Sequence, residues 1–419
     1  MTYTNDMKIT DCAMRIWRDA KDALAPMGRA EKGFHIFWLL GPFILLIERS
    51  PADLWLSVLA LAFAVRAIAT KQGAWLKVFW VRAAFAFWAV TIISALASTD
   101  PSYATGEALV WFRFPLFAMA TMFWLGTDKR LLYAMMAATA LGLLVMCAIL
   151  SAELLIEGQK GGRLSWPYGD LVPGNYVAKV GLPVFTVMVA LAVSVKGRLA
   201  AISGIVALFT MVISIMTGER INFLIRACSG MLAGLVWKPK WNRYLALVAI
   251  EVLAVVLLFA AAPDISNRYV NDFFSQLPTG DHSIYYNTMT PGVMAYEQSP
   301  VLGIGTANFR NMCPEIIGDI PKLECHPHPH NFYIQMLAET GIIGLIFGTI
   351  FLWSIIVTCF KASWRNRDNV VLATACIVPF GMFWPIASSA DFFGQWNNIF
   401  MWSAVALALG AVNLAPDKK

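Results

Sequence analysis

The chain of 419 residues alternates between long apolar runs and short polar connections over most of its length. A run of about 20 apolar residues is long enough for an α-helix to cross the hydrocarbon core of a bilayer. The pattern predicts an all-α integral membrane protein with about twelve transmembrane helices. The predicted spans are 34–49, 52–70, 78–97, 114–126, 131–153, 177–195, 199–217, 220–237, 241–262, 335–360, 369–390 and 396–415.

Lysine and arginine gather in every second connection, counted from the N-terminus. Examples are Lys129 with Arg130, and Lys196 with Arg198. Cytoplasmic connections of membrane proteins carry such an excess of positive charge. The pattern therefore predicts that both termini lie in the cytoplasm. No cleavable signal peptide is expected, because the first apolar run begins only near Phe34 and no cleavage site of small residues follows it.

One outside connection is much longer than the others, and long connections between packed elements are usually functional. It separates the ninth and tenth predicted helices. The chain is therefore expected to divide into a cytoplasmic segment 1–33, helices 1–9 in 34–262, a periplasmic loop 263–334 that carries the chemistry, and helices 10–12 with a cytoplasmic C-terminus in 335–419.

Composition supports the membrane assignment. Charged residues make up 14% of the chain and hydrophobic residues 58%, whereas soluble domains carry about 25% charged residues. The net charge of +6 gathers on the predicted cytoplasmic side, which favours membrane lipids as partners and gives no indication of nucleic-acid binding. Residues 8–25 fit either an amphipathic helix on the membrane surface or a solvated tail.

Three of the five histidines, His326, His328 and His330, lie close together in the sequence CHPHPHN. They fit a metal site, an ordinary surface loop, or a single catalytic imidazole. Alternating prolines predict an extended segment that would hold the three side chains about 6–7 Å apart, too far for one ion to collect easily. His330, directly before a predicted span, is the best candidate for a general base.

The helix after the histidines carries a polar face. Asn331, Gln335 and Glu339 recur every four residues, so they lie on one side of a helix. Polar side chains at that depth usually point into the bundle. Small residues at Gly341 and Gly344 favour close helix packing.

Several arginines fall at or near the predicted outer surface: Arg163, Arg220, Arg268 and Arg310. Guanidinium groups bind phosphate through two parallel hydrogen bonds, so this set favours a diphosphate over a neutral solute. Arg226 differs because it lies within a predicted span, where it is either functional or part of an ion pair with Glu251 or Glu153.

Only two cysteines, Cys313 and Cys325, lie in the long outside loop. In an oxidising compartment they are candidates for a disulfide. The chain contains no GxSxG, HExxH or CxxC sequence, which removes support for α/β-hydrolase, zinc protease and thioredoxin chemistry.

Two segments together resemble the O-antigen ligase and polymerase superfamily. They are SPVLGIGTANF (299–309) and HPHNFYIQMLAETGIIGL (328–345), which match that family's G-x-G-x-x-x-F run, its H-N pair and its E-x-G helix. TGERINFLI (217–225) resembles the family's turn before an arginine, and FRFPLF (112–117) is similar to ligase members.

The resemblance implies a GT-C-type glycosyltransferase that uses an undecaprenyl-diphosphate-linked glycan at the periplasmic face of the inner membrane, without a metal or other cofactor. His330 then matches the catalytic histidine, Arg220 and Arg268 match the diphosphate clamps, and Arg163 is a weaker candidate. The supporting residues would be His328, Asn331, Glu339 and Arg310.

One departure affects the second clamp. Many family members have an arginine shortly before a tryptophan ahead of the G-x-G run, but residues 282–300 contain no arginine. Either Arg268 or Arg310 then takes that role, or the clamp has changed.

The predicted reaction is transfer of O-antigen onto the lipid A–core of lipopolysaccharide. A repeat-unit polymerase and a protein O-oligosaccharyltransferase share the same motifs. From other classes, a twelve-span transporter that uses Arg226 and a membrane scaffold with a dispensable histidine cluster remain alternatives. Against the transporter are the absence of repeated halves and the single large loop.

Overall fold

The computed structural model describes residues 9–272, 283–385 and 390–416. Helices supply the regular structure of these residues, and no strand occurs among them. The first half contains α1 (Ile9–Leu24), α2 (Arg29–Leu39), α3 (Gly41–Ile44), α4 (Arg49–Ala69), η1 (Ala74–Lys77), α5 (Phe79–Leu96), α6 (Pro101–Trp111), α7 (Arg113–Ala120), η2 (Thr121–Leu125), α8 (Lys129–Ile156), α9 (Val172–Asn175), η3 (Tyr176–Val180) and α10 (Leu182–Ser194).

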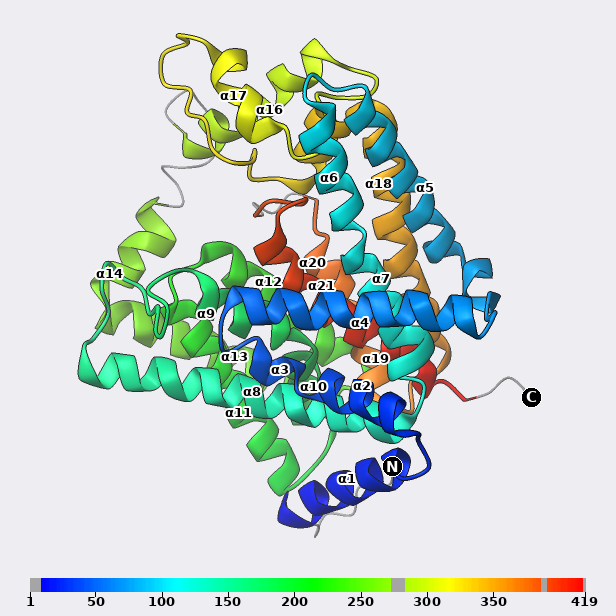
Figure 1. The fold of residues 1–419 in the computed structure, drawn as a ribbon. Coiled ribbons are helices and arrows are strands. Elements are labelled where there is room, and N and C mark those ends of the chain that lie inside the picture. Colours follow the sequence, from blue (N-terminus) through cyan, green and yellow to red (C-terminus); the bar gives the residue numbers. More distant parts are fainter. Residues whose placement is uncertain (1–8, 273–282, 386–389, 417–419) are drawn as a thin grey trace.

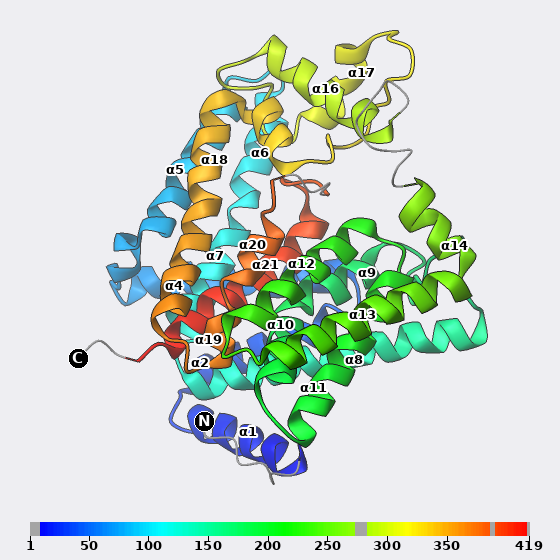
Figure 2. The ribbon, with the colours of Figure 1, turned by 180° about the vertical axis from the view of Figure 1, so that it is seen from behind.

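The second half carries the long connection and the last helices. It contains α11 (Arg198–Met216), α12 (Arg220–Val236), α13 (Trp241–Ala261), α14 (Pro263–Ser266), η4 (Asn267–Asn271), α16 (Ile284–Gln298), α17 (Phe309–Ile317), α18 (Phe332–Arg365), α19 (Val370–Thr374), α20 (Ile377–Met382), α21 (Gln395–Ala411) and η5 (Val412–Leu414). In Figures 1 and 2, α16 and α17 lie beside the upper ends of α5, α6 and α18, away from both chain termini.

Within the described residues, eight helices are long and apolar enough to cross a membrane. The number rises to nine if the bent pair Val172–Val180 and Leu182–Ser194 forms one span. The chain is thus a multi-pass membrane protein, but the predicted count of twelve is not confirmed. The predicted span 34–49 is broken into α2 and α3, 220–237 forms a helix of only 17 residues, and 369–390 contains the short helices α19 and α20.

The span predicted at 114–126 begins earlier than the apolar pattern indicated. It forms a continuous candidate span from Pro101 to Leu125. The start is set locally, because the Asp100 side chain accepts a hydrogen bond from the Tyr103 backbone N–H and Pro101 occupies the first turn. The N-terminal cap at Asp100 therefore starts the helix at Pro101, ahead of the most apolar residues at 114–126.

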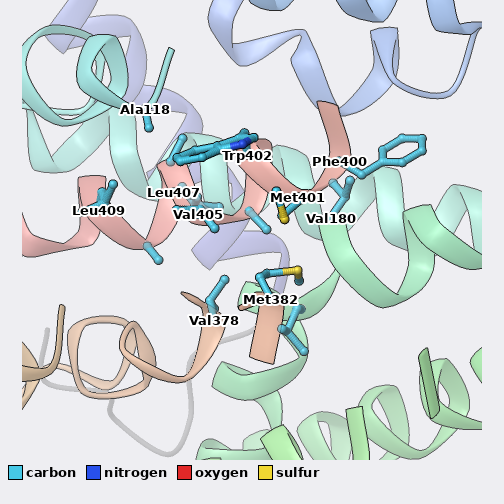
Figure 3. Packing of buried hydrophobic residues seen from close by; sticks show 14 of the residues in the cluster. Ala118, Val180, Val378, Met382, Phe400, Met401, Trp402, Val405, Leu407 and Leu409 are labelled. Carbon is cyan, nitrogen blue, oxygen red and sulfur yellow. The ribbon is translucent and has the colours of Figure 1, made fainter. Parts of the chain in front are cut away.

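Helix α21 forms the centre of the packed core. Phe400 and Trp402 are fully buried, and Figure 3 shows Met382 of α20, Val180 of η3 and Ala118 of α7 around this helix. Helix α13 is the opposite case, because none of its residues is buried. Its apolar surface is that of a helix facing lipid.

The helix expected near residues 8–25 is present as α1. Ala20, Ala23 and Leu24 are buried against the core, whereas Met14 and Trp17 are exposed. Exposed apolar side chains beside charged ones suit the headgroup region of a bilayer. The location of α1 on a membrane surface stays a prediction.

Helix α18 bends at Gly341, whose φ of 65° and ψ of −169° are adopted readily only by glycine. The 299–305 turn packs into the bend. Gly305 N–H donates to the Glu339 carbonyl at 2.9 Å, and Ile342 N–H donates to the Pro300 carbonyl at 2.9 Å. The G-x-G run and the E-x-G helix, separate in the sequence, therefore form one packed unit.

Replacing Gly341 with Ala is expected to lower the thermal stability of the detergent-solubilised protein strongly. The new Cβ would overlap the backbone of Val301 and Leu302, and the conformation alone costs about 1–3 kcal/mol for a non-glycine residue. Gly33→Ala in α2 is the matched control. No atom lies within 4 Å of its Cβ position, so its Tm should stay unchanged or rise. Equal Tm values for Gly341→Ala and the wild type would contradict the strain.

Candidate functional site

Three arginines from separate segments meet at the turn between α11 and α12. Arg163 pairs with Glu219 at 3.0 Å. Arg268 donates from Nε to the Gly218 carbonyl at 2.6 Å, and Arg220 begins α12 directly after the turn. We call Arg163, Arg220 and Arg268 the arginine cluster.

The backbone of this turn explains the close approach. Gly218 has a φ of +74°, and a Cβ on it would lie 2.6 Å from Arg163 Cγ and 3.0 Å from Arg268 Nε. A Cβ on Gly174 of α9 would lie 2.7 Å from Thr217 Oγ1. Because Gly174 and Gly218 have no side chain, α9 and the side chains of Arg163 and Arg268 can pack directly on the turn before α12.

The cluster brings three positive charges together, and the carboxylate of Glu219 pairs with one of them, Arg163. Burial, followed by the nearby charge of Arg163, lowers the pKa of Arg268 below its ordinary value. An arginine remains charged at neutral pH even so. The cluster also lies at the N-terminus of a 17-residue helix, where backbone N–H groups and the helix dipole favour an anion.

The three histidines form a compact group, so the extended conformation predicted for this segment was wrong. The ring centroids of His328 and His330 are 4.4 Å apart, and those of His326 and His330 are 5.2 Å apart. The reason is local: His330 has a φ of +55°, which turns the chain. Among the described residues, no group of three or more His, Cys, Asp or Glu side chains has an arrangement that could hold a metal ion.

His330 occupies a half-buried position directly before α18. Burial, and after it the neighbouring His328 and His326 rings, lowers the pKa of His330 to about 4. Its imidazole is therefore neutral at pH 7, the form that accepts a proton.

Asn331 fixes the start of α18 next to His330. Its side-chain oxygen accepts hydrogen bonds from Tyr333 and Ile334 N–H, while its Nδ2 donates to the Pro385 carbonyl at 2.9 Å. The Tyr333 hydroxyl donates to the Phe383 carbonyl at 2.8 Å. The connection after α20 therefore holds the turn that carries His330.

The polar face of α18 continues into a buried network. Gln335 donates to Asp391 Oδ1 at 2.6 Å and to Glu339 Oε1 at 3.3 Å. Glu339 is fully buried and accepts from Ala307 N–H at 2.7 Å. Arg310 pairs with Asp391 at 2.5 Å. Arg310 thus belongs to this network rather than to the arginine cluster, and Arg268 is the arginine near Arg220.

Sequence reasoning missed Asp391. It lies in the short connection between the predicted spans 369–390 and 396–415, and it was assigned no role. The signal available was its isolation, because few carboxylates occur near the apolar C-terminal helices and such a group requires a polar partner when buried.

Asp391→Asn is expected to weaken the attachment of the 299–310 segment to α18 and to lower Tm. The variant loses the charge on Asp391 that pairs with Arg310, and because Arg310 is partly exposed, this pair contributes about 1 kcal/mol or less. Thermal unfolding of the purified protein checks this. Asp368→Asn is the control, because Asp368 is exposed where it pairs with Lys238. Equal losses for both variants would contradict the network.

Cys313 and Cys325, the two candidate cysteines of the long connection, form a disulfide with Cα atoms 5.7 Å apart. Cys313 is fully buried against Phe309 and Ile316. The bridge closes the segment just before the histidines, so it limits the freedom of the chain that leads to His330.

Arg226 does not form the ion pair considered for it. Its guanidinium donates to the Val177 carbonyl at 2.7 Å and to Thr210 Oγ1 at 2.6 Å, and lies 4.0 Å from the centre of the Phe185 ring. Glu153 instead accepts from Ser165 N–H. Arg226 therefore joins α12, η3 and α11.

Comparison with known proteins covers part of the chain. Residues 204–349 match a family model described as O-Antigen ligase. No curated protein matches the sequence. One similar solved chain belongs to a structure titled "Structural coordination of polymerization and crosslinking by a peptidoglycan synthase complex", with a TM-score of 0.48, 13% identity, and coverage of 81% of this chain and 98% of that chain. That likeness is too weak to support an argument about fold or function.

The matched segment contains the 217–220 turn, the G-x-G run, His330 and the Glu339 helix. It is thus the part of the chain that carries the motifs quoted for the resemblance. The family match over residues 204–349 confirms the predicted resemblance to the O-antigen ligase and polymerase superfamily.

Proposed function

We propose that this protein is a glycosyltransferase that moves a glycan from undecaprenyl diphosphate to a hydroxyl group of lipid A–core. The observation that carries the proposal is the arginine cluster. Three guanidinium groups from distant segments gather at one helix N-terminus, where Arg163 pairs with the carboxylate of Glu219. A diphosphate matches that excess of positive charge, and the family match agrees with a lipid-linked glycan as substrate.

In the proposed reaction, the acceptor oxygen forms a bond to the anomeric carbon of the glycan. The bond from that carbon to the diphosphate oxygen breaks, and its electron pair leaves with undecaprenyl diphosphate. His330 takes the proton of the acceptor hydroxyl. The arginine cluster stabilises the charge that develops on the leaving diphosphate, the kind of fixed electrostatic stabilisation that contributes most in enzymes.

This mechanism requires no metal ion, because the arginine cluster supplies the positive charge that a divalent cation provides in other diphosphate sites. His328 lies against His330 and orients its ring. Asn331 joins the end of the histidine turn to the Pro385 carbonyl, and Glu339 joins α18 to the backbone of Ala307.

The proposed orientation places the arginine cluster and the histidine turn in the periplasm and both termini in the cytoplasm of a bacterial inner membrane. The basic connections support it through the positive-inside rule. The Cys313–Cys325 disulfide lies in the same long connection and suits an oxidising compartment.

The transporter alternative receives little support from Arg226. Two of its guanidinium nitrogens donate to Val177 and Thr210, and the side chain is fully buried. A transport residue would instead contact its solute near the middle of the membrane. The same contacts make Arg226 a packing residue.

The test is transfer by purified protein in vesicles that contain undecaprenyl-diphosphate glycan and lipid A–core, with EDTA present. Glycan on lipid A–core supports the ligase. Growth of the lipid-linked glycan without transfer to lipid A–core would replace the ligase with a repeat-unit polymerase. No change in any glycan, for a protein that remains folded, would overturn the proposed reaction.

A further inference from the structure

Lys179 is a buried lysine that the mechanism above does not use. It lies in η3, in the bent pair of helices between Val172 and Ser194, and only 8% of the residue is exposed. Short π-helical turns frequently occur at functional sites. Burying a charged side chain inside a membrane protein costs free energy unless the charge has a partner. The groups around the Lys179 ammonium group therefore indicate its role.

The direct partner of Lys179 is an uncharged amide. Nζ donates to Oδ1 of Asn397, in the first turn of α21. Figure 3 shows the adjoining contact, with Val180 of η3 beside Met401 and Phe400 of α21. Among the described residues, no salt bridge involves Lys179, and Nδ2 of Asn397 is buried without a hydrogen-bond partner. An ammonium group and an amide N–H₂ thus share a place that has donors in excess of acceptors.

This place adjoins the arginine cluster. Gly174, five residues before Lys179, packs on Thr217, and its Cβ position lies 3.5 Å from Glu219 Cγ. Glu219 also acts electrostatically on Lys179. The carboxylate of Glu219 therefore pairs with Arg163 and lies near enough to act on the charge of Lys179.

The same place adjoins the support of the histidine turn. Asn397 follows Asp391 by six residues at the start of α21, and Asp391 binds Gln335 of α18. The connection before α21 also accepts the Asn331 hydrogen bond at Pro385. Lys179 thus contacts α21 beside the arginine cluster, and the connection before α21 holds the turn that carries His330.

We propose that Lys179 is a further binding residue for the diphosphate of the lipid-linked donor, acting with Asn397 on the side of the arginine cluster that leads to His330. The inference rests on the proposed function. When the donor binds, its phosphate oxygens accept from the Lys179 ammonium group, which gains a charged acceptor beside Asn397 Oδ1, and from Asn397 Nδ2, which gains the acceptor that it lacks. The leaving diphosphate is then held from α12, η3 and α21 as well as by Arg163 and Arg268.

A purely structural lysine predicts a different behaviour on substitution. Removing a buried charge that has no carboxylate in direct contact removes a desolvation cost, so a structural role predicts equal or higher stability and unchanged donor binding. The proposed role predicts equal or higher stability together with weaker donor binding. The combination of the two measurements separates the roles.

The experiment measures binding of undecaprenyl diphosphate to the full chain in nanodiscs, together with Tm and glycan transfer, for wild type, Lys179→Met and Lys160→Met. Lys160 is exposed and pairs with Glu157, so Lys160→Met should bind as wild type. Lys179→Met is expected to raise Kd about tenfold or more, the scale of one lost charge-assisted hydrogen bond. Wild-type binding by a folded Lys179→Met protein would overturn the inference.

Asn397→Asp is a second variant that keeps the side-chain volume. It gives Lys179 a carboxylate partner and places a negative charge where the donor phosphate would lie, so the inference predicts a similar rise in Kd. Unchanged Kd would overturn the inference even if Lys179→Met failed to fold. If wild type transfers glycan and both variants bind normally, only the role of Lys179 fails. If wild type binds no undecaprenyl diphosphate, the proposed function fails with it.

Discussion

Replacing His330 with Ala is expected to lower kcat for glycan transfer by about 10²–10⁴-fold, the usual contribution of a positioned general base. The acceptor hydroxyl is a poor nucleophile until its proton is removed. Donor binding should stay close to wild type, because the arginine cluster does not include His330. Single-turnover transfer and undecaprenyl diphosphate binding, measured in the same vesicles, check both parts.

The pH dependence of wild-type transfer follows from the same residue. The pKa of His330 is lowered to about 4 by burial and by the neighbouring histidines. The imidazole is the neutral base above pH 4 and is protonated below it. Transfer should therefore be insensitive to this group from pH 8 down to about 5 and fall only near pH 4, whereas an ordinary histidine would already reduce the rate near pH 6.5.

His326→Ala is the control for this prediction. The His326 ring lies 5.2 Å from His330 and is nearer the surface, where it faces Glu324 at 3.6 Å. Its loss should leave the rate within a few-fold of wild type and move the acid limb slightly upward, because one neighbouring ring is removed. Full activity of His330→Ala would exclude His330 from proton transfer.

The apolar pattern was sufficient for the long helices but not for the broken ones. Spans such as 52–70 and 131–153 correspond to α4 and α8, because length and hydropathy alone define them. The pair of helices around Gly181, and the short helices α2, α3, α19 and α20, depend on where the backbone bends against its neighbours. A count of apolar runs does not contain that information.

The site shows the same division. Residue type and predicted sidedness indicated Arg163, Arg220 and Arg268, and the structure brings them to one turn through glycine at 218. Asp391 and Lys179 were not found. Asp391 lies in the short connection between the last two predicted spans and Lys179 lies within the predicted span 177–195, and each acquires its partner from a helix distant in sequence. Contacts of that kind follow from tertiary packing, which single-sequence reasoning does not supply.

Arg268→Ala is expected to lower kcat/KM by about 10²–10³-fold, the scale seen when one preorganised group that stabilises developing charge is removed. The loss should appear in undecaprenyl diphosphate binding as well as in kcat. Arg268→Lys should restore little of it. The Nε–H of Arg268 anchors the guanidinium to the Gly218 carbonyl at 2.6 Å, and lysine has neither that donor nor the planar fork that binds phosphate through two hydrogen bonds.

Arg198→Ala is the matched control, because Arg198 is exposed at the start of α11, the opposite end of that helix from the arginine cluster. It should bind and transfer as wild type. Raising the salt concentration should weaken donor binding less in Arg268→Ala than in wild type, since one charged contact is absent. If Arg268→Lys instead matched wild type in both binding and kcat, a point charge would be sufficient at this position, and the anchored fork would have no role in the site.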